Sequence, residues 1–175
     1  MVIRAQTQPH IEVHRFFPGV VVGVAAVALV LQAFLPVYIH RAQDYLELPL
    51  LVTIYFGLSR RNPTTGLLLG MVMGLLQDSL SSGRSPIGLY GIAKTLVGFF
   101  ASSLGSRIDT EHPVSRFLLT AAFFHFHHVA YVVIMGLLLG RKEPLMSRPL
   151  LVASLVNAVL AVVLFPFLDR LRRPS

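Results

Sequence analysis

Residues 66–105 read GLLLGMVMGLLQDSLSSGRSPIGLYGIAKTLVGFFASSLG, two apolar segments joined by a short polar turn at 81–85. In the first segment, residues at steps of four are three glycines and a carboxylate: Gly66, Gly70, Gly74 and Asp78. In the second, steps of three and four join Gly91, Lys94, Gly98 and Ser102. Residues at this spacing share one face of a helix. Membrane helices approach closely through such small-residue faces, because lipid supplies no hydrophobic drive for their association. The stretch therefore predicts a tight helical hairpin inside lipid.

The composition of the whole chain favours a membrane protein. Of its 175 residues 54% are apolar and only 13% are charged, whereas soluble chains carry about 25% charged residues. The mean hydropathy of +0.69 is too high for a water-soluble fold. The formal net charge of +7 comes from short basic clusters between apolar runs, so we expect membrane topology rather than a nucleic-acid partner. The absence of cysteine excludes disulfides and thiolate metal sites.

Hydropathy predicts an all-α polytopic membrane protein with six transmembrane helices in one compact domain, residues 1–175. The first apolar run has roughly 24 uncharged residues, enough to cross a hydrocarbon core about 30 Å thick. Because no small-x-small cleavage site follows it, we expect a retained span rather than a signal peptide. The second segment is short for a full crossing, so a tilted helix, a thinned bilayer and a re-entrant piece all stay open. The predicted spans are 16–39, 45–59, 64–80, 86–105, 117–139 and 150–168.

The basic residues indicate an orientation for these spans. An even number of spans places both termini on one side of the membrane. The side with the termini holds nine basic residues: Arg4, Arg15, Arg60, Arg61, Arg107, Arg116, Arg170, Arg172 and Arg173. The opposite side holds five: Arg41, Arg84, Arg141, Lys142 and Arg148. Since cytoplasmic loops carry the excess of Lys and Arg, we expect both termini in the cytoplasm.

Lys94 lies about eight residues into its predicted span and is the one charge that we expect deep inside the membrane. Burying a lysine in lipid is costly unless it is paired or reaches water with its long side chain. Helical side chains lean toward the helix N-terminus, which brings Lys94 toward Asp78 at the end of the preceding segment. We predict that these two residues form a contact, direct or through water, that locks the hairpin. The alternative is that Lys94 extends to the membrane surface and Asp78 only ends its helix.

The fifth predicted span contains the run Phe123-Phe-His125-Phe-His127-His128. His125 and His128 share a helical face and His127 points away, so at most two imidazoles converge, and the span contains no carboxylate that could serve as a third metal ligand. We expect these histidines to bond neighbouring carbonyls or hydroxyls. The sequence shows no P-loop, no dinucleotide fingerprint and no convincing nucleophile and base set. It therefore predicts neither a cofactor nor an enzymatic activity.

Two motifs carry a family resemblance. They are Gly70-x-x-x-Gly74-Leu-Leu-Gln77-Asp78 and, after the polar turn, Ser85-Pro86-Ile-Gly88-Leu-Tyr90-x-x-x-Lys94-Thr-Leu-Val-Gly98. This stretch, about residues 55–105, resembles the core of the bacterial rod shape-determining protein MreD family. The histidine run is not part of that pattern.

The resemblance implies a non-enzymatic inner-membrane component of the cell-elongation machinery, which acts in lateral peptidoglycan synthesis. Such a protein would bind an MreC-like bitopic protein and thereby link MreB filaments to RodA and the elongation-specific penicillin-binding protein. The family fold is similar to the substrate-binding membrane subunits of energy-coupling-factor vitamin transporters. The matching positions are expected to shape the hairpin or a partner surface, with a groove along the small-residue faces as one candidate: Gly70, Gly74, Gln77, Asp78, Pro86, Gly88, Lys94 and Gly98.

A second class of function stays open at the level of sequence. A six-span bundle with an interior lysine could be a solute-binding transporter subunit, in which Lys94 or His125 contacts an anionic or aromatic ligand. Few aromatic groups are available to line such a pocket beyond Tyr55, Tyr90 and Tyr131. Co-purification with an MreC-like protein would favour the scaffold, whereas a vitamin-like molecule that raises the melting temperature would favour the transporter.

Overall fold

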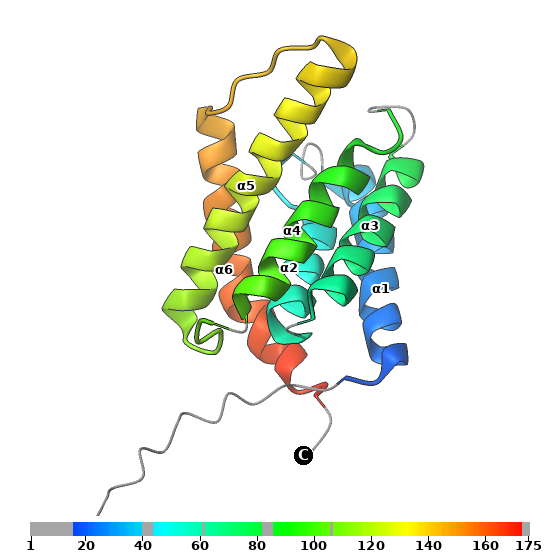
Figure 1. Cartoon of the computed structure of the whole chain (residues 1–175). Coiled ribbons are helices and arrows are strands. Elements are labelled where there is room, and N and C mark those ends of the chain that lie inside the picture. Colours follow the sequence, from blue (N-terminus) through cyan, green and yellow to red (C-terminus); the bar gives the residue numbers. More distant parts are fainter. Residues whose placement is uncertain (1–15, 40–43, 61, 82–85, 106, 173–175) are drawn as a thin grey trace, which may run out of the picture.

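The computed structural model describes residues 16–39, 44–60, 62–81, 86–105 and 107–172. These residues form six helices and no strand, which confirms the all-α prediction (Figure 1). One helix lies at each predicted segment, and the bounds differ by no more than four residues. The helices are α1 (Pro18–Tyr38), α2 (Leu48–Arg60), α3 (Pro63–Leu80), α4 (Leu89–Gly105), α5 (Pro113–Leu139) and α6 (Arg148–Asp169).

Proline and a capping side chain start several of these helices. A proline stands at the first or second position of α1, α3, α5 and α6, where a missing N–H costs nothing because that group has no partner within the helix. The side chain of Asn62 caps α3 by accepting from the amides of Thr64 and Thr65. Ser147 caps α6 in the same way through the amide of Leu150. Local sequence thus fixes where these helices begin.

The helices run alternately up and down, so α1 begins and α6 ends at the same end of the bundle (Figure 1). The α2–α3 and α4–α5 connections lie at that end, which we call the basal end. The α5–α6 connection lies at the opposite, apical end, together with the start of α2 and the start of α4. Consecutive helices of the described chain therefore run antiparallel to one another.

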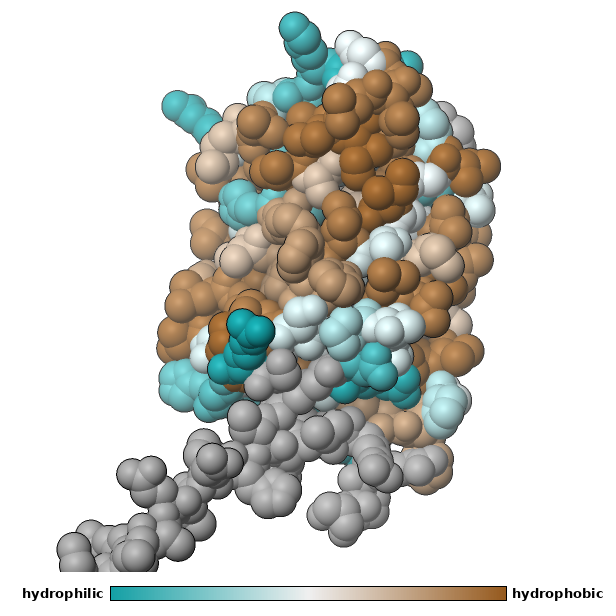
Figure 2. Space-filling model, in the orientation of Figure 1, coloured by the Kyte–Doolittle hydropathy of each residue, from teal (hydrophilic) through white to brown (hydrophobic). Residues whose placement is uncertain are grey.

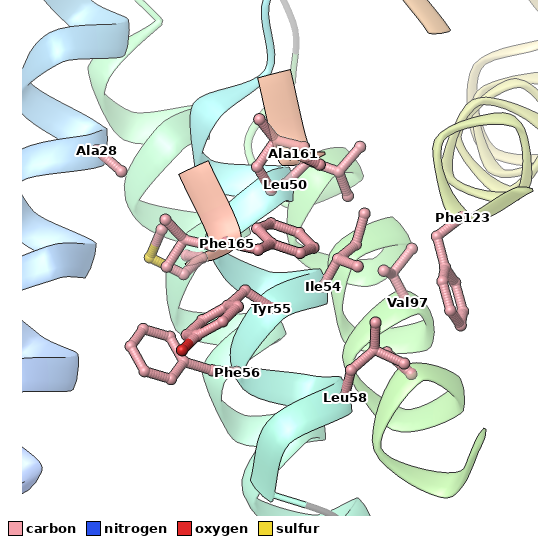
Figure 3. Packing of buried hydrophobic residues seen from close by; sticks show 14 of the residues in the cluster. Ala28, Leu50, Ile54, Tyr55, Phe56, Leu58, Val97, Phe123, Ala161 and Phe165 are labelled. Atoms are coloured by element: carbon pink, nitrogen blue, oxygen red, sulfur yellow. The ribbon is translucent and has the colours of Figure 1, made fainter. Parts of the chain in front are cut away.

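Helix α2 is the core of the bundle. Every residue from Pro49 to Ser59 is buried, and α2 contacts all five other helices. Figure 3 shows the side chains of α2 among those of α1, α4, α5 and α6. With 13 residues the helix is about 20 Å long, shorter than a hydrocarbon core, but its neighbours surround it. The short second segment is therefore an interior helix covered by protein.

The α3–α4 hairpin is as close as the glycine spacing predicts. A methyl group at Gly70 would overlap the carbonyl oxygen of Lys94, and one at Gly74 would overlap that of Tyr90. A methyl group at Gly98 would overlap the backbone of Gly66. The two backbones thus touch where side chains would normally separate them, which confirms the tight, glycine-faced pair.

The outer surface of the bundle is largely apolar. Large apolar side chains point outward on every helix except α2, and Figure 2 shows them covering most of the middle of one face, with hydrophilic residues gathered mainly toward the two ends. Three helices, α1, α5 and α6, are long and apolar enough to cross a membrane. A large apolar surface of this kind requires an apolar solvent, so the protein is a membrane protein.

Candidate functional site

The polar centre of the bundle is Lys94 on α4, whose side chain is fully buried. Its Nζ lies 3.2 Å from Oε2 of Glu47 and 3.4 Å from Nε2 of His127. The same ammonium lies 4.5 Å from the centroid of the Tyr90 ring, within the range of a cation–π contact. An ammonium can only donate hydrogen bonds, so Nε2 of His127 is the acceptor. We call Glu47, Gln77, Tyr90, Lys94 and His127 the Lys94 cluster.

The predicted direct contact between Lys94 and Asp78 is wrong. Lys94 pairs with Glu47 instead, a residue just before α2 and distant in sequence. Asp78 Oδ2 accepts from the amides of Gly88, at 2.8 Å, and Gly91, at 3.2 Å. The carboxylate is held there because the first amides of α4 have no partner within that helix and attract a negative charge.

Asp78 thus closes the hairpin from the end of α3. Gly88 precedes α4 with a φ of 110°, a left-handed conformation that favours glycine. Its amide is therefore free to turn toward Asp78 rather than continue a helix. Pro86, the other predicted residue of this turn, is exposed.

Gln77 links Asp78's helix to the Lys94 cluster. Its side-chain nitrogen lies 3.3 Å from both carboxylate oxygens of Glu47. Glu47 therefore receives donors from α3 and α4 together, as a carboxylate that is largely removed from water requires. The predicted residues Gln77 and Lys94 meet at this carboxylate.

Two buried amides position Glu47 at the apical end. Gln32 of α1 donates to the carbonyl of Leu46 and accepts from the amide of Leu48. Asn157 of α6 donates to the carbonyl of Tyr45 and accepts from the amide of Glu47 at 3.0 Å. Non-helical backbone inside a membrane protein needs such internal partners. Gln32 and Asn157 thus hold the segment 45–48 rigidly against the bundle.

Aromatic rings cover the Lys94 cluster on the α5 side. Tyr90 stacks on His127, with ring centroids 5.7 Å apart, and on Tyr131 at 5.0 Å. His127 is the histidine that faces the interior, whereas His128 bonds the carbonyl of Pro144. The helical spacing places His127 on the opposite face from His125 and His128 but does not identify that face as the buried one.

The other two histidines have the structural partners that we expected. Nδ1 of His125 lies 2.9 Å from the carbonyl oxygen of Ala121 and 3.2 Å from Oγ of Ser154, and Nε2 of His128 lies 3.1 Å from the carbonyl oxygen of Pro144. Each ring ties α5 to a neighbouring turn or helix. Within the described ranges no three His, Asp or Glu side chains gather as a metal site requires.

A second polar cluster, centred on Asp169, lies at the basal end. The carboxylate of Asp169 receives Arg116 from α5, Arg172 from the C-terminal turn and the Tyr55 hydroxyl from α2. Arg172 also pairs with Glu111 at 2.8 Å. Burial acts to lower the pKa of Arg172, but the hydrogen bond to Glu111 and the charge of Asp169 outweigh it and raise that pKa.

The bond to Asp169 places the Tyr55 hydroxyl at the basal end of the bundle. Tyr90 lies at the start of α4, at the apical end, and stacks on Tyr131. The three tyrosines therefore do not line one pocket.

Sequence reasoning missed Glu47, Gln32 and Asn157 as parts of the site. Each is an isolated polar residue in an apolar segment, and such residues face partners rather than lipid. Glu47 also stands just before α2, at the same apical end of the bundle as the start of α4, the helix that carries Lys94. The acidic residues of the other predicted spans are therefore candidate counter-ions for Lys94, together with those of the hairpin.

Removing the Asp78 carboxylate is expected to weaken the hairpin measurably. Asp78→Ala leaves the amides of Gly88 and Gly91 without their acceptor, which costs about 2 kcal/mol in unfolding free energy. Asp78→Asn keeps a carbonyl acceptor and is expected to lose less. The measurement is SDS-induced unfolding in mixed micelles.

The matched control is the neighbouring Ser79→Ala, because Ser79 is exposed and its hydroxyl bonds the Leu75 carbonyl of its own helix. We expect this control to change stability by less than about 0.5 kcal/mol. Equal losses for Asp78→Ala and Ser79→Ala would show that the carboxylate does not close the hairpin.

The fold and this polar centre define a class: an all-helical membrane protein whose buried charges pair with one another and tie its helices together. Within this class the chain belongs to a known family. The family model of the rod shape-determining protein MreD matches residues 14–174, almost the whole chain. No curated protein and no solved structure gave a significant match.

Proposed function

We propose that this protein is a non-enzymatic membrane scaffold of the bacterial cell-elongation machinery. Membership of the MreD family supports a role in rod shape determination. The finer proposal is that it binds an MreC-like bitopic protein and, through it, acts together with MreB, RodA and the elongation-specific penicillin-binding protein in lateral peptidoglycan synthesis.

The observation that carries a scaffold role is the use of the buried charges. Lys94 is fully buried, and its contacts with Glu47 and His127 join α4 to the start of α2 and to α5. Asp169 joins α6 to α2 and α5 at the other end. Polar groups that serve as links between helices give a fixed shape, and a fixed shape is what a docking partner requires.

The partner is proposed to dock on the outer surface of the bundle. The small-residue faces of α3 and α4 are pressed against each other, with backbone atoms where a partner side chain would have to enter. These faces therefore leave no room for the groove that the glycine pattern suggested. The exposed apolar faces of the outer helices are the surfaces available within the described residues.

We further propose that the protein resides in the inner membrane with both termini in the cytoplasm. The position of the start of α1 and the end of α6 at one end of the bundle supports this topology, as does the excess of basic residues on the segments at that end. Similarity of the bundle to the substrate-binding subunits of energy-coupling-factor transporters stays a prediction.

Co-purification tests the scaffold proposal. When the full chain is co-expressed with the MreC-like protein of the same organism and solubilised in a mild detergent, affinity capture of one is expected to recover the other at least tenfold above an unrelated bitopic protein. A folded, monodisperse sample that captures no MreC-like protein would contradict the proposal. A vitamin-type molecule that raises the melting temperature would instead favour the transporter reading.

A further inference from the structure

A groove opens on the outer surface where α1, α2 and α3 meet, and it has a volume of about 260 Å³. Its walls are apolar and include Phe56, Leu69 and Val72. Its polar side chains are Arg60, the last residue of α2, and Thr65 in the first turn of α3. The groove is therefore polar at the basal end and apolar along its length.

The length of the groove fits an amphipathic ligand rather than a small anion. Thr65 and Val72 lie seven residues apart on α3, so Val72 is about 10 Å further along the helix axis, away from the basal end. Leu68 and Val72, on its outer rim, are about half exposed and continuous with the lipid-facing surface. A ligand that reaches Val72 from Arg60 thus needs an apolar portion about as long as half an acyl chain.

Among the described residues, no acidic side chain pairs with Arg60. Within the described ranges the salt bridges of the protein involve Lys94, Arg116 and Arg172, and none involves Arg60. The amides at the start of α3 are already bonded to Asn62, which leaves the guanidinium as the main anion donor. Guanidinium groups bind phosphate with two parallel hydrogen bonds.

We propose that this groove binds one anionic phospholipid, with its phosphate at Arg60 and one acyl chain along Phe56, Leu69 and Val72. Basic pockets between helices near a membrane surface bind anionic headgroups, and lipid is the solvent that the groove faces. A partner helix in the groove would cover the guanidinium of Arg60 without satisfying it unless that helix brought an acid. The proposal does not depend on the scaffold function.

Native mass spectrometry of the full chain in detergent tests whether the groove prefers an anionic headgroup and whether Arg60 causes that preference. The probes are phosphatidylglycerol and phosphatidylethanolamine with identical acyl chains. We expect phosphatidylglycerol to be retained several-fold more than phosphatidylethanolamine, and Arg60→Gln to reduce its retention about fivefold, the effect of one charge at a membrane surface. Arg107→Gln, which removes an exposed charge at the same basal end, is expected to keep retention within twofold of the unchanged protein.

A second pair of variants tests whether an acyl chain occupies the apolar part of the groove. Val72→Phe places a larger ring in the groove, whereas Val163→Phe makes the same change on the exposed face of α6. Val72→Phe is expected to lower phosphatidylglycerol retention at least threefold and Val163→Phe to leave it unchanged, with both variants keeping the parental melting temperature.

Equal retention of the two lipids, equal losses for Arg60→Gln and Arg107→Gln, or unchanged retention for Val72→Phe would each overturn the proposal. Cross-linking of a co-expressed single-span protein to Val72, without loss when phosphatidylglycerol is added, would assign the groove to a protein partner instead.

Discussion

Replacement of Lys94 with methionine is expected to lower the free energy of unfolding by about 3 kcal/mol. Methionine has nearly the length of lysine and creates little empty space, so the loss reports the charge. Its physical cause is Glu47, whose carboxylate keeps Gln77 as a donor but loses its counter-ion inside the bundle. We take the low end of the range for a broken buried pair because the side chain of Glu47 is 14% exposed. The measurement is SDS-induced unfolding in mixed micelles.

The double variant Lys94→Met with Glu47→Leu shows whether the stability loss of Lys94→Met comes from the broken ion pair or from poorer packing. Replacing both members of a buried ion pair by apolar side chains is often close to neutral, so the double variant is expected to recover at least half of the loss of the single one. Strictly additive losses in this double-mutant cycle would show that the two residues are not coupled.

Lys142→Met is the matched control for Lys94→Met, because Lys142 lies exposed in the α5–α6 connection. The same chemical change there is expected to alter stability by less than about 0.5 kcal/mol. Equal changes in the free energy of unfolding for Lys94→Met and Lys142→Met would show that the buried ion pair of Lys94 does not stabilise the fold.

The hairpin was predictable from sequence because its information is local and periodic. Glycines at steps of four indicate which face of a helix can approach another backbone. The helix that it approaches comes next in the chain, after one short turn. The start of α4 was less well predicted, since Pro86 marks the turn and the helix begins at Leu89. Gly88 between them adopts a left-handed conformation, which the sequence does not dictate.

The partner of Lys94 was not predictable by the same reasoning. Glu47 is separated from it by 47 residues, and its position depends on Gln32 and Asn157 in the first and last helices. Likewise, the spacing of the histidines gives their relative faces but not which face the bundle buries. Contacts of this kind depend on how all six helices pack, which no local pattern contains.

Replacement of Gly98 with alanine is the most direct test of that packing. Alanine is the better helix former by about 1 kcal/mol, so on an open face this change would be harmless in terms of propensity. At position 98 the added methyl group would overlap the backbone of Gly66, which cannot rotate away as a side chain can. The helices α3 and α4 must therefore separate along their contact, and we expect a loss of about 3 kcal/mol in SDS unfolding, the upper end for overpacking.

Two other glycines provide controls of graded severity. A methyl group at Gly91, on the same helix, would come within 2.9 Å of Leu75 Cδ2, the end of a flexible side chain. One at Gly23 on α1 would meet nothing within 4 Å. We expect a loss below about 1 kcal/mol for Gly91→Ala and none for Gly23→Ala. The order of stability, Gly23→Ala above Gly91→Ala above Gly98→Ala, follows from what each methyl group meets. If Gly98→Ala were as stable as Gly23→Ala, the backbones of α3 and α4 would lie further apart in the membrane than the structure places them.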